Sequence, residues 1–238
     1  MDYLTIVQTA MNRAKAREGA PSSISGAVGL GSDFANWVGD AWRDLQESDT
    51  DWWFRQKLDQ TLAITAGTDA YAMPSGLETL NYRTISVYTV AGEDEYRINF
   101  VRYEDWRMNK DTLNSGTGRP ALITERPDGV IQLWPEPDQD YTLRFDGVWE
   151  VDAMVDDADT PGSNVTGGTT LPDTYHWILV WDAVRRYAQA HSDTDKLVVA
   201  EGNFLAQRNR LVERQTPPPY VPMGTLTGMS NTNRRVNF

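Results

Sequence analysis

The sequence has 238 residues, of which 40% are hydrophobic and nine are tryptophan, enough to fill the core of one large domain or two small ones. Cysteine is absent, which excludes disulfides, thiolate zinc sites and cysteine nucleophiles. The formal net charge of −12 argues against tight nonspecific binding to nucleic acid, because phosphate affinity comes from clustered Lys and Arg.

The sequence predicts neither a membrane-spanning segment nor a signal peptide. No run of 18 apolar residues occurs, and acidic Asp2 stands where a signal peptide would carry positive charge. We therefore expect synthesis and assembly in the cytoplasm.

The first predicted element is an amphipathic helix. Apolar residues recur at helical spacing over residues 3–14, and we expect this helix to end near Gly19. Residues 18–32 are rich in small side chains and form a connector, with Ser32 as a candidate N-cap for the next helix. The connector's glycines do not open a nucleotide-binding fingerprint, because no strand precedes them and their spacing is wrong.

A second amphipathic helix is predicted from Phe34 to Leu45, where apolar residues follow i, i+3, i+4, i+7 spacing. The acidic stretch 47–51 ends it.

From residue 52 the apolar periodicity changes to two, which is typical of strands. We expect strands at residues 82–90, 96–101, 121–125, 130–134 and 141–145. Residues 52–64 could form a helix or a strand, and we take them as a strand. Two hairpins are predicted, at residues 61–74 and 132–145, the second with a turn around Pro135 and Pro137.

Residues 150–173 contain six acids and no Lys or Arg, which indicates an exposed acidic loop. Asp156, Asp157 and Asp159 suggest a cation site. However, Pro161 and Gly168 stand where an EF-hand needs oxygen ligands, so a solvated acidic loop is the better interpretation.

Two further helices are predicted after this loop. Pro172 suits the first turn of the first helix, whose stripe includes Trp177 and Trp181. Ser192 and Asp195 form a candidate capping box for the second, in which apolar residues recur every seven positions from Leu197. The short turn between them predicts an antiparallel pair.

Residues 216–238 are rich in proline and lack core periodicity, so we expect an extended interaction arm. Its candidate contact residues are Pro217, Pro218, Pro219, Tyr220, Val221, Arg234, Arg235 and Phe238.

The predicted fold class is α+β: a discontinuous α-helical bundle from the N- and C-terminal segments, with an inserted antiparallel β module and an extended C-terminal arm. The expected divisions are N-terminal helices (1–51), β domain (52–150), acidic loop (151–171), C-terminal helices (172–215) and arm (216–238).

The sequence offers little catalytic chemistry. His176 and His191 lie on one predicted helix, roughly 22 Å apart, and cannot share a metal ion. No G-x-S-x-G turn supports a Ser-His-Asp arrangement. We expect no catalytic residues, metal site or cofactor. Trp37, Trp42, Trp177 and Trp181 are expected in the core, whereas Trp106 and the pair Trp52–Trp53 could pack in the core or at a subunit interface.

Four stretches together resemble the head-to-tail adaptor family of tailed bacteriophages, also called head-completion or tail tubular proteins. They are ANWVGDAWRDLQESDTDWWF, GTDAYAMP, VIQLWPEPDQDYTLRFDGVW and LPDTYHWILVWDAVRRYA. The likeness covers most of residues 33–215. The N-terminal helix and its connector have no firm match, and their role stays open.

The resemblance implies a virion protein of the neck between head and tail. Such a protein forms a ring, usually dodecameric, beneath the portal, conducts DNA without binding it tightly, and carries tail or nozzle proteins. The C-terminal arm would reach onto the portal. One alternative is a tail-associated carbohydrate-binding module, because exposed Trp and acidic residues suit sugars. A hydrolase is a third possibility, for which the motifs are missing.

Overall fold

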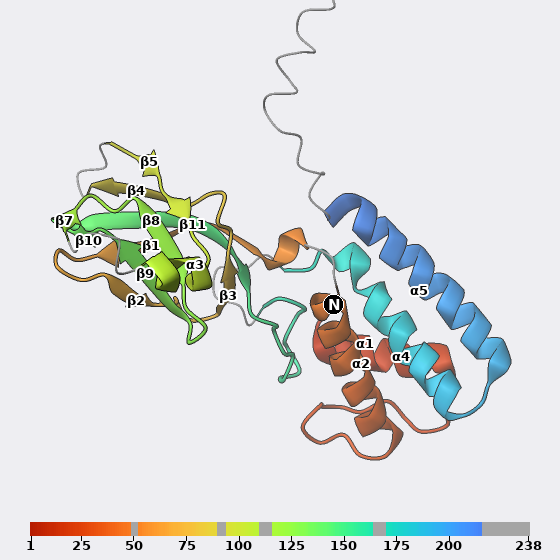
Figure 1. Ribbon diagram of the computed structural model, residues 1–238. Helices are drawn as coiled ribbons and strands as arrows, with labels where there is room; N and C mark the ends of the chain where they lie inside the picture. The colour runs from red at the N-terminus through yellow and green to blue at the C-terminus, as the bar shows by residue number, and fades with distance from the viewer. Residues whose placement is uncertain (49–51, 90–93, 110–115, 164–169, 216–238) are drawn as a thin grey trace, which may run out of the picture.

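The structure, a computed structural model, describes residues 1–48, 52–89, 94–109, 116–163 and 170–215. These residues form a bundle of helices and a β module, each with its own hydrophobic core (Figure 1). The bundle helices come from both ends of the chain and the strands from its middle, so the α+β fold class is confirmed. The arm at 216–238 lies outside the described residues.

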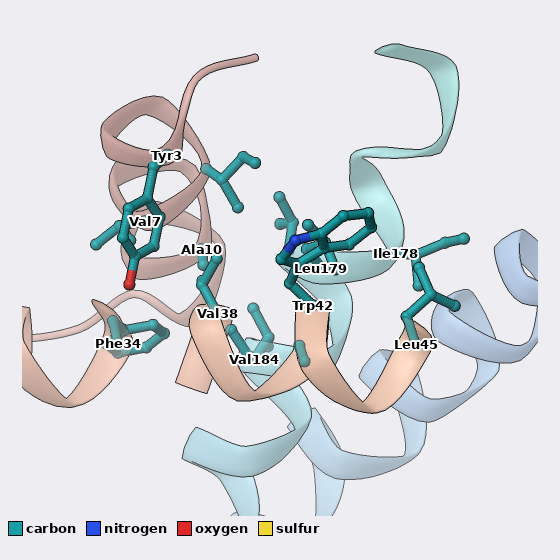
Figure 2. Close-up of a cluster of buried hydrophobic side chains, with 14 of the residues drawn as sticks. Tyr3, Val7, Ala10, Phe34, Val38, Trp42, Leu45, Ile178, Leu179 and Val184 are labelled. Atoms are coloured by element: carbon teal, nitrogen blue, oxygen red, sulfur yellow. The ribbon is translucent and has the colours of Figure 1, made fainter. Parts of the chain in front are cut away.

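Within the described ranges, four helices build the bundle: α1 (Tyr3–Ala14), α2 (Leu30–Glu47), α4 (Trp177–Ala190) and α5 (Thr194–Gln215). Helix α4 is central, because it packs against α1, α2 and α5. Helices α4 and α5 run antiparallel across a short turn, as predicted (Figure 1). Figure 2 shows the core between α1, α2 and α4, where Val7, Val38, Trp42, Leu179 and Val184 meet.

The boundaries of the first two helices differ from the prediction. Helix α1 ends at Ala14 and not near Gly19, because Lys15 adopts the left-handed conformation with φ 52°. Helix α2 begins at Leu30, so Ser32 lies inside the helix and is not its cap. The Glu18 carboxylate instead accepts a hydrogen bond from the Leu30 N–H at 2.8 Å.

The predicted capping box of the last helix is also wrong. Ser192 has φ 53° and precedes the helix, while the Asp193 carboxylate accepts the Lys196 N–H at 3.1 Å. The helix that was expected to start at Pro172 begins as a short 3₁₀ turn, η2 (Asp173–Tyr175), before α4.

The β module has two main sheets. The first orders β1 (Gln56–Ile64), β11 (Tyr141–Trp149), β4 (Ser86–Thr89) and β5 (Tyr96–Arg97), and β3 (Leu77–Leu80) also pairs with β11. The second orders β2 (Ala70–Ala72), β9 (Val130–Trp134), β8 (Leu122–Glu125) and β6 (Asn99–Phe100). Strands β7 (Thr117–Gly118) and β10 (Glu136–Pro137) pair separately. Helix η1 (Trp53–Arg55) precedes β1, and α3 (Tyr103–Asn109) follows β6.

Both predicted hairpins are wrong. Strands β1 and β2 belong to different sheets, and so do β9 and β11. Residues 132–145 therefore cross from one sheet to the other, and both sheets contribute side chains to one core that includes Ile131, Leu133, Leu143 and Phe145. Most pairs are antiparallel as expected, but β6–β8 and β7–β10 are parallel.

Several predicted strands are shorter or divided. The 82–90 strand is reduced to β4, and the 96–101 strand is split into β5 and β6. By contrast, β11 extends beyond the predicted 141–145 to Trp149 and keeps the alternation of buried and half-buried residues throughout.

Candidate functional site

The two histidines occupy the two ends of α4. His176 is 1% exposed, and its Nε2 donates to the Leu171 carbonyl at 2.8 Å while its Nδ1 lies 2.8 Å from the Met1 amino nitrogen. Burial lowers the pKa of His176 below its usual value. His191 bonds the Tyr187 carbonyl at 3.0 Å. Each histidine thus holds a helix end, as the sequence suggested.

The acidic loop is largely exposed, as predicted, but it is also anchored to the bundle. Asp152 is 7% exposed; its carboxylate accepts the Gly162 N–H, and burial raises its pKa. The carbonyls of Asp157 and Asp159 accept the first N–H groups of α1, from Leu4 and Tyr3. The loop therefore caps α1 through its backbone.

Parts of this loop remain at the surface. Val151 is 37% exposed and Val155 67% exposed. Within the described residues, no group of three or more His, Cys, Asp or Glu is placed to hold a metal ion.

The tryptophans are distributed differently from the prediction. Trp42 and Trp52 are 1% exposed, and the rings of Trp42 and Trp52 both stack on Phe54. Trp177 and Trp181, expected in the core, are only half-buried at its edge, where the Arg13 guanidinium lies 5.3 and 6.0 Å from their ring centroids. Aliphatic neighbours on α4 occupy the core instead: Ile178, Leu179, Val180 and Val184.

Exposed tryptophan was the main argument for a carbohydrate-binding module. All nine tryptophans lie in the described residues, and only Trp53, at 46%, is exposed. Trp106, which the sequence could not place, is buried. One exposed tryptophan does not make an aromatic binding platform.

A cavity of about 380 Å³ opens on the first sheet of the β module. Three of its charged side chains, Glu95, Arg144 and Asp146, already have partners. Arg144 pairs with Glu95 at 3.3 Å, and the Asp146 carboxylate accepts the Asp59 N–H at 2.8 Å. These contacts connect residues of the sheet to one another.

The junction between the bundle and the β module is tightly connected. Arg55 donates to the Gln46 carbonyl at the end of α2, at 2.7 Å, and to the Trp149 carbonyl at the end of β11, at 2.6 Å. The Gln46 side chain exchanges two hydrogen bonds, each 2.8 Å, with the Asp152 backbone. The end of α2 is thus joined to the end of the last strand and to the loop that follows it.

The outer side of α5 is unusually apolar for a surface. Val198, Val199 and Leu205 are 67%, 58% and 46% exposed. The predicted seven-residue repeat places Leu211 in the core and leaves Val198 and Leu205 at the surface. Helix α5 packs mainly on α4 and lies on the side of the bundle away from the β module (Figure 1).

A comparison with protein families identifies the chain. A family model described as the SU10 adaptor protein matches residues 1–224. The match defines the class, a structural adaptor protein of bacteriophages, and so a component of the virion. The chain belongs to the SU10 adaptor protein family. No curated protein matches it.

The family match extends the likeness seen in the sequence. It includes helix α1 and the connector, which had no firm match, and α1 places Ile6, Val7 and Ala10 in the core with no exposed surface. Throughout the described ranges, no helix combines the length and apolar character needed to span a bilayer. The candidate arm residues, Pro217 to Val221, Arg234, Arg235 and Phe238, lie outside the described residues.

Proposed function

We propose that this protein forms a ring, dodecameric as is usual for head-to-tail adaptors, beneath the portal of a phage head. The ring completes the head, conducts DNA and supplies the platform on which tail or nozzle proteins assemble. The observation that carries this proposal is the adaptor-family match over residues 1–224. The surface also supports it, because exposed aliphatic clusters of this kind mark interaction sites.

The C-terminal segment is the proposed portal contact. Residues 217–219 are three consecutive prolines, which resist helix and central-strand pairing, and Tyr220 and Val221 follow them. Arg234 and Arg235 give residues 216–238 a positive charge without any acid. A cationic arm on an acidic body is suited to binding a partner while the folded part remains free to form the ring.

The acidic composition supports the passage of DNA. Each copy carries a net charge of −12, and an acidic or neutral channel wall keeps the duplex from adhering. The two arginines of the arm supply too few phosphate contacts for strong affinity. The proposed role is to conduct DNA without retaining it.

Portal binding tests the proposal. The full chain, a variant ending at residue 215, and a variant with residues 216–238 replaced by a Gly/Ser segment of equal length are mixed with the portal protein. We expect all three to share one melting temperature, and only the full chain to sediment with the portal. Equal portal binding by all three variants would contradict the role of the arm.

A further inference from the structure

The outer face of α5 carries an uncharged strip through its central turns. The strip consists of Val198, Val199, Gly202, Leu205, Ala206 and Asn209. These positions recur at spacings of three and four, so they share one side of the helix. The strip extends roughly 16 Å along the axis. It lies on the side opposite to buried Ala200 and Leu211.

Gly202 indicates that something approaches this strip closely. Glycine inside a helix is less stable than alanine, because it loses more backbone entropy on folding. Its presence in α5 therefore needs an explanation. A Cβ at position 202 meets nothing within 4 Å in the described chain. Packing within the described chain therefore does not require glycine here. A glycine on an exposed helix face allows a partner to reach the backbone.

A second apolar surface lies on the other side of the bundle. It consists of the loop at 150–163, with exposed Val151 and Val155. This loop bonds to α1, whereas α5 packs on α4, and α4 packs on α1. In Figure 1 the loop and α5 lie on opposite sides of the bundle. Of the nine large hydrophobic side chains exposed in the described ranges, five lie on these two surfaces.

The charges decide which surfaces can meet. The loop contains five acids, Glu150, Asp152, Asp156, Asp157 and Asp159, and no base. Two copies of the loop would therefore repel each other. Helix α5 has four bases and three acids, and its central strip is uncharged. The acidic loop therefore complements α5 better than it complements itself.

We propose that the outer strip of α5 docks against the 150–163 loop of a neighbouring copy. This inference rests on the proposed ring, because a ring requires two different, complementary faces on each subunit. Val198 and Leu205 contact Val151 and Val155 of the next copy, and Gly202 lets that loop approach the helix backbone. The contact is head-to-tail and continues from copy to copy until the ring closes.

Engineered cysteines test this contact, because the natural chain has none. The Val155→Cys/Leu205→Cys variant is assembled and treated with a short bismaleimide. We expect a ladder of covalent multimers on a denaturing gel. Each single-cysteine variant should run as a monomer on this gel after treatment, because neither surface contacts the same surface of another copy. The control Val155→Cys/Leu58→Cys, whose Leu58 is 62% exposed on β1, should give no ladder.

A second variant tests the close approach at Gly202. Gly202→Trp should fold with an unchanged circular dichroism spectrum, because the position faces open space. It should raise the protein concentration for half-assembly by about tenfold or more. Gly116→Trp is the matched control, because a Cβ at Gly116 also meets nothing within 4 Å.

The outcomes separate this inference from the proposed function. Particle mass is measured before cross-linking, with and without portal. Rings that give no Val155–Leu205 ladder, or that tolerate Gly202→Trp, would overturn the proposed contact and leave the ring standing. Protein that stays monomeric in both conditions would overturn both. Dimers from either single-cysteine variant would show a symmetric contact and contradict the head-to-tail arrangement.

Discussion

Trp52 and Trp53 are adjacent in sequence and should differ sharply in their effect on stability. Trp52 is 1% exposed, stacks on Phe54 at 5.7 Å, and donates from Nε1 to the Leu45 carbonyl at 2.7 Å. Truncating a buried aromatic residue to alanine costs roughly 3–5 kcal/mol. The lost hydrogen bond at the end of α2 adds about 1 kcal/mol. We therefore expect Trp52→Ala to lower the unfolding free energy by at least about 4 kcal/mol.

Two matched variants separate packing from hydrogen bonding. Trp52→Phe keeps most of the ring but loses the N–H donor, and it should cost about 1–2 kcal/mol. Trp53→Ala removes a side chain that is 46% exposed, and it should cost less than about 1 kcal/mol. Urea denaturation followed by far-ultraviolet circular dichroism measures all three. A loss below about 1 kcal/mol for Trp52→Ala, or equal losses at both positions, would refute this account of the junction.

Three further predictions concern the helices and DNA. Trp177→Ala should lower the unfolding free energy by about 1–2 kcal/mol in the same assay. This is less than for a buried aromatic residue, because the Trp177 ring lies at the edge of the core beneath Arg13. A loss of about 4 kcal/mol would place the ring in the core. Because burial lowers the pKa of His176 in the folded protein, His176 contributes stability that is present above pH 6.5 and is lost as the pH falls through the folded pKa. The unfolding free energy of His176→Gln should therefore fall less between pH 7 and pH 5 than that of the natural chain. Identical pH profiles of the two proteins would refute this. Duplex DNA near physiological salt should bind more weakly than about 1 μM in a fluorescence anisotropy titration, because the chain carries −12, and submicromolar affinity would contradict a low-adhesion channel.

The sequence predicts secondary structure in the β module better than it predicts strand partners. Alternation along residues 141–145 marked a strand and its buried face, and Tyr141, Leu143 and Phe145 are indeed buried. Alternation carries no information on which strand lies alongside. Strands that are close in sequence therefore suggested hairpins, whereas β9 and β11 belong to different sheets and do not pair with each other.

Helix ends show a similar limit. Ser32 and Ser192 have the side chains of N-cap residues, yet neither is a cap. The Glu18 carboxylate serves α2 from twelve residues away, a distance that no local pattern detects. Likewise, apolar spacing on α4 included Trp177 and Trp181 in the stripe, but the core is filled by aliphatic neighbours such as Leu179. Apolar periodicity predicts which face of a helix is buried, but it does not predict how much of the helix circumference is buried.

The sequence predicted the buried and exposed faces of α5 only in part. The repeat from Leu197 pointed to a helix pair, and Leu211 is buried in the core of the bundle as that pattern indicates. The apolar residues Val198 and Leu205 belong to the same repeat but remain exposed. Gly202 is the local signal that distinguishes the outer strip, because its missing side chain has no explanation within the described bundle.

The most direct test of the account is electron microscopy of the purified protein mixed with its portal. We expect closed rings of this protein on one end of the portal, with twelve copies around an acidic or neutral channel. Portal particles that carry no added ring, while the protein remains monomeric at every ratio, would contradict the central claim.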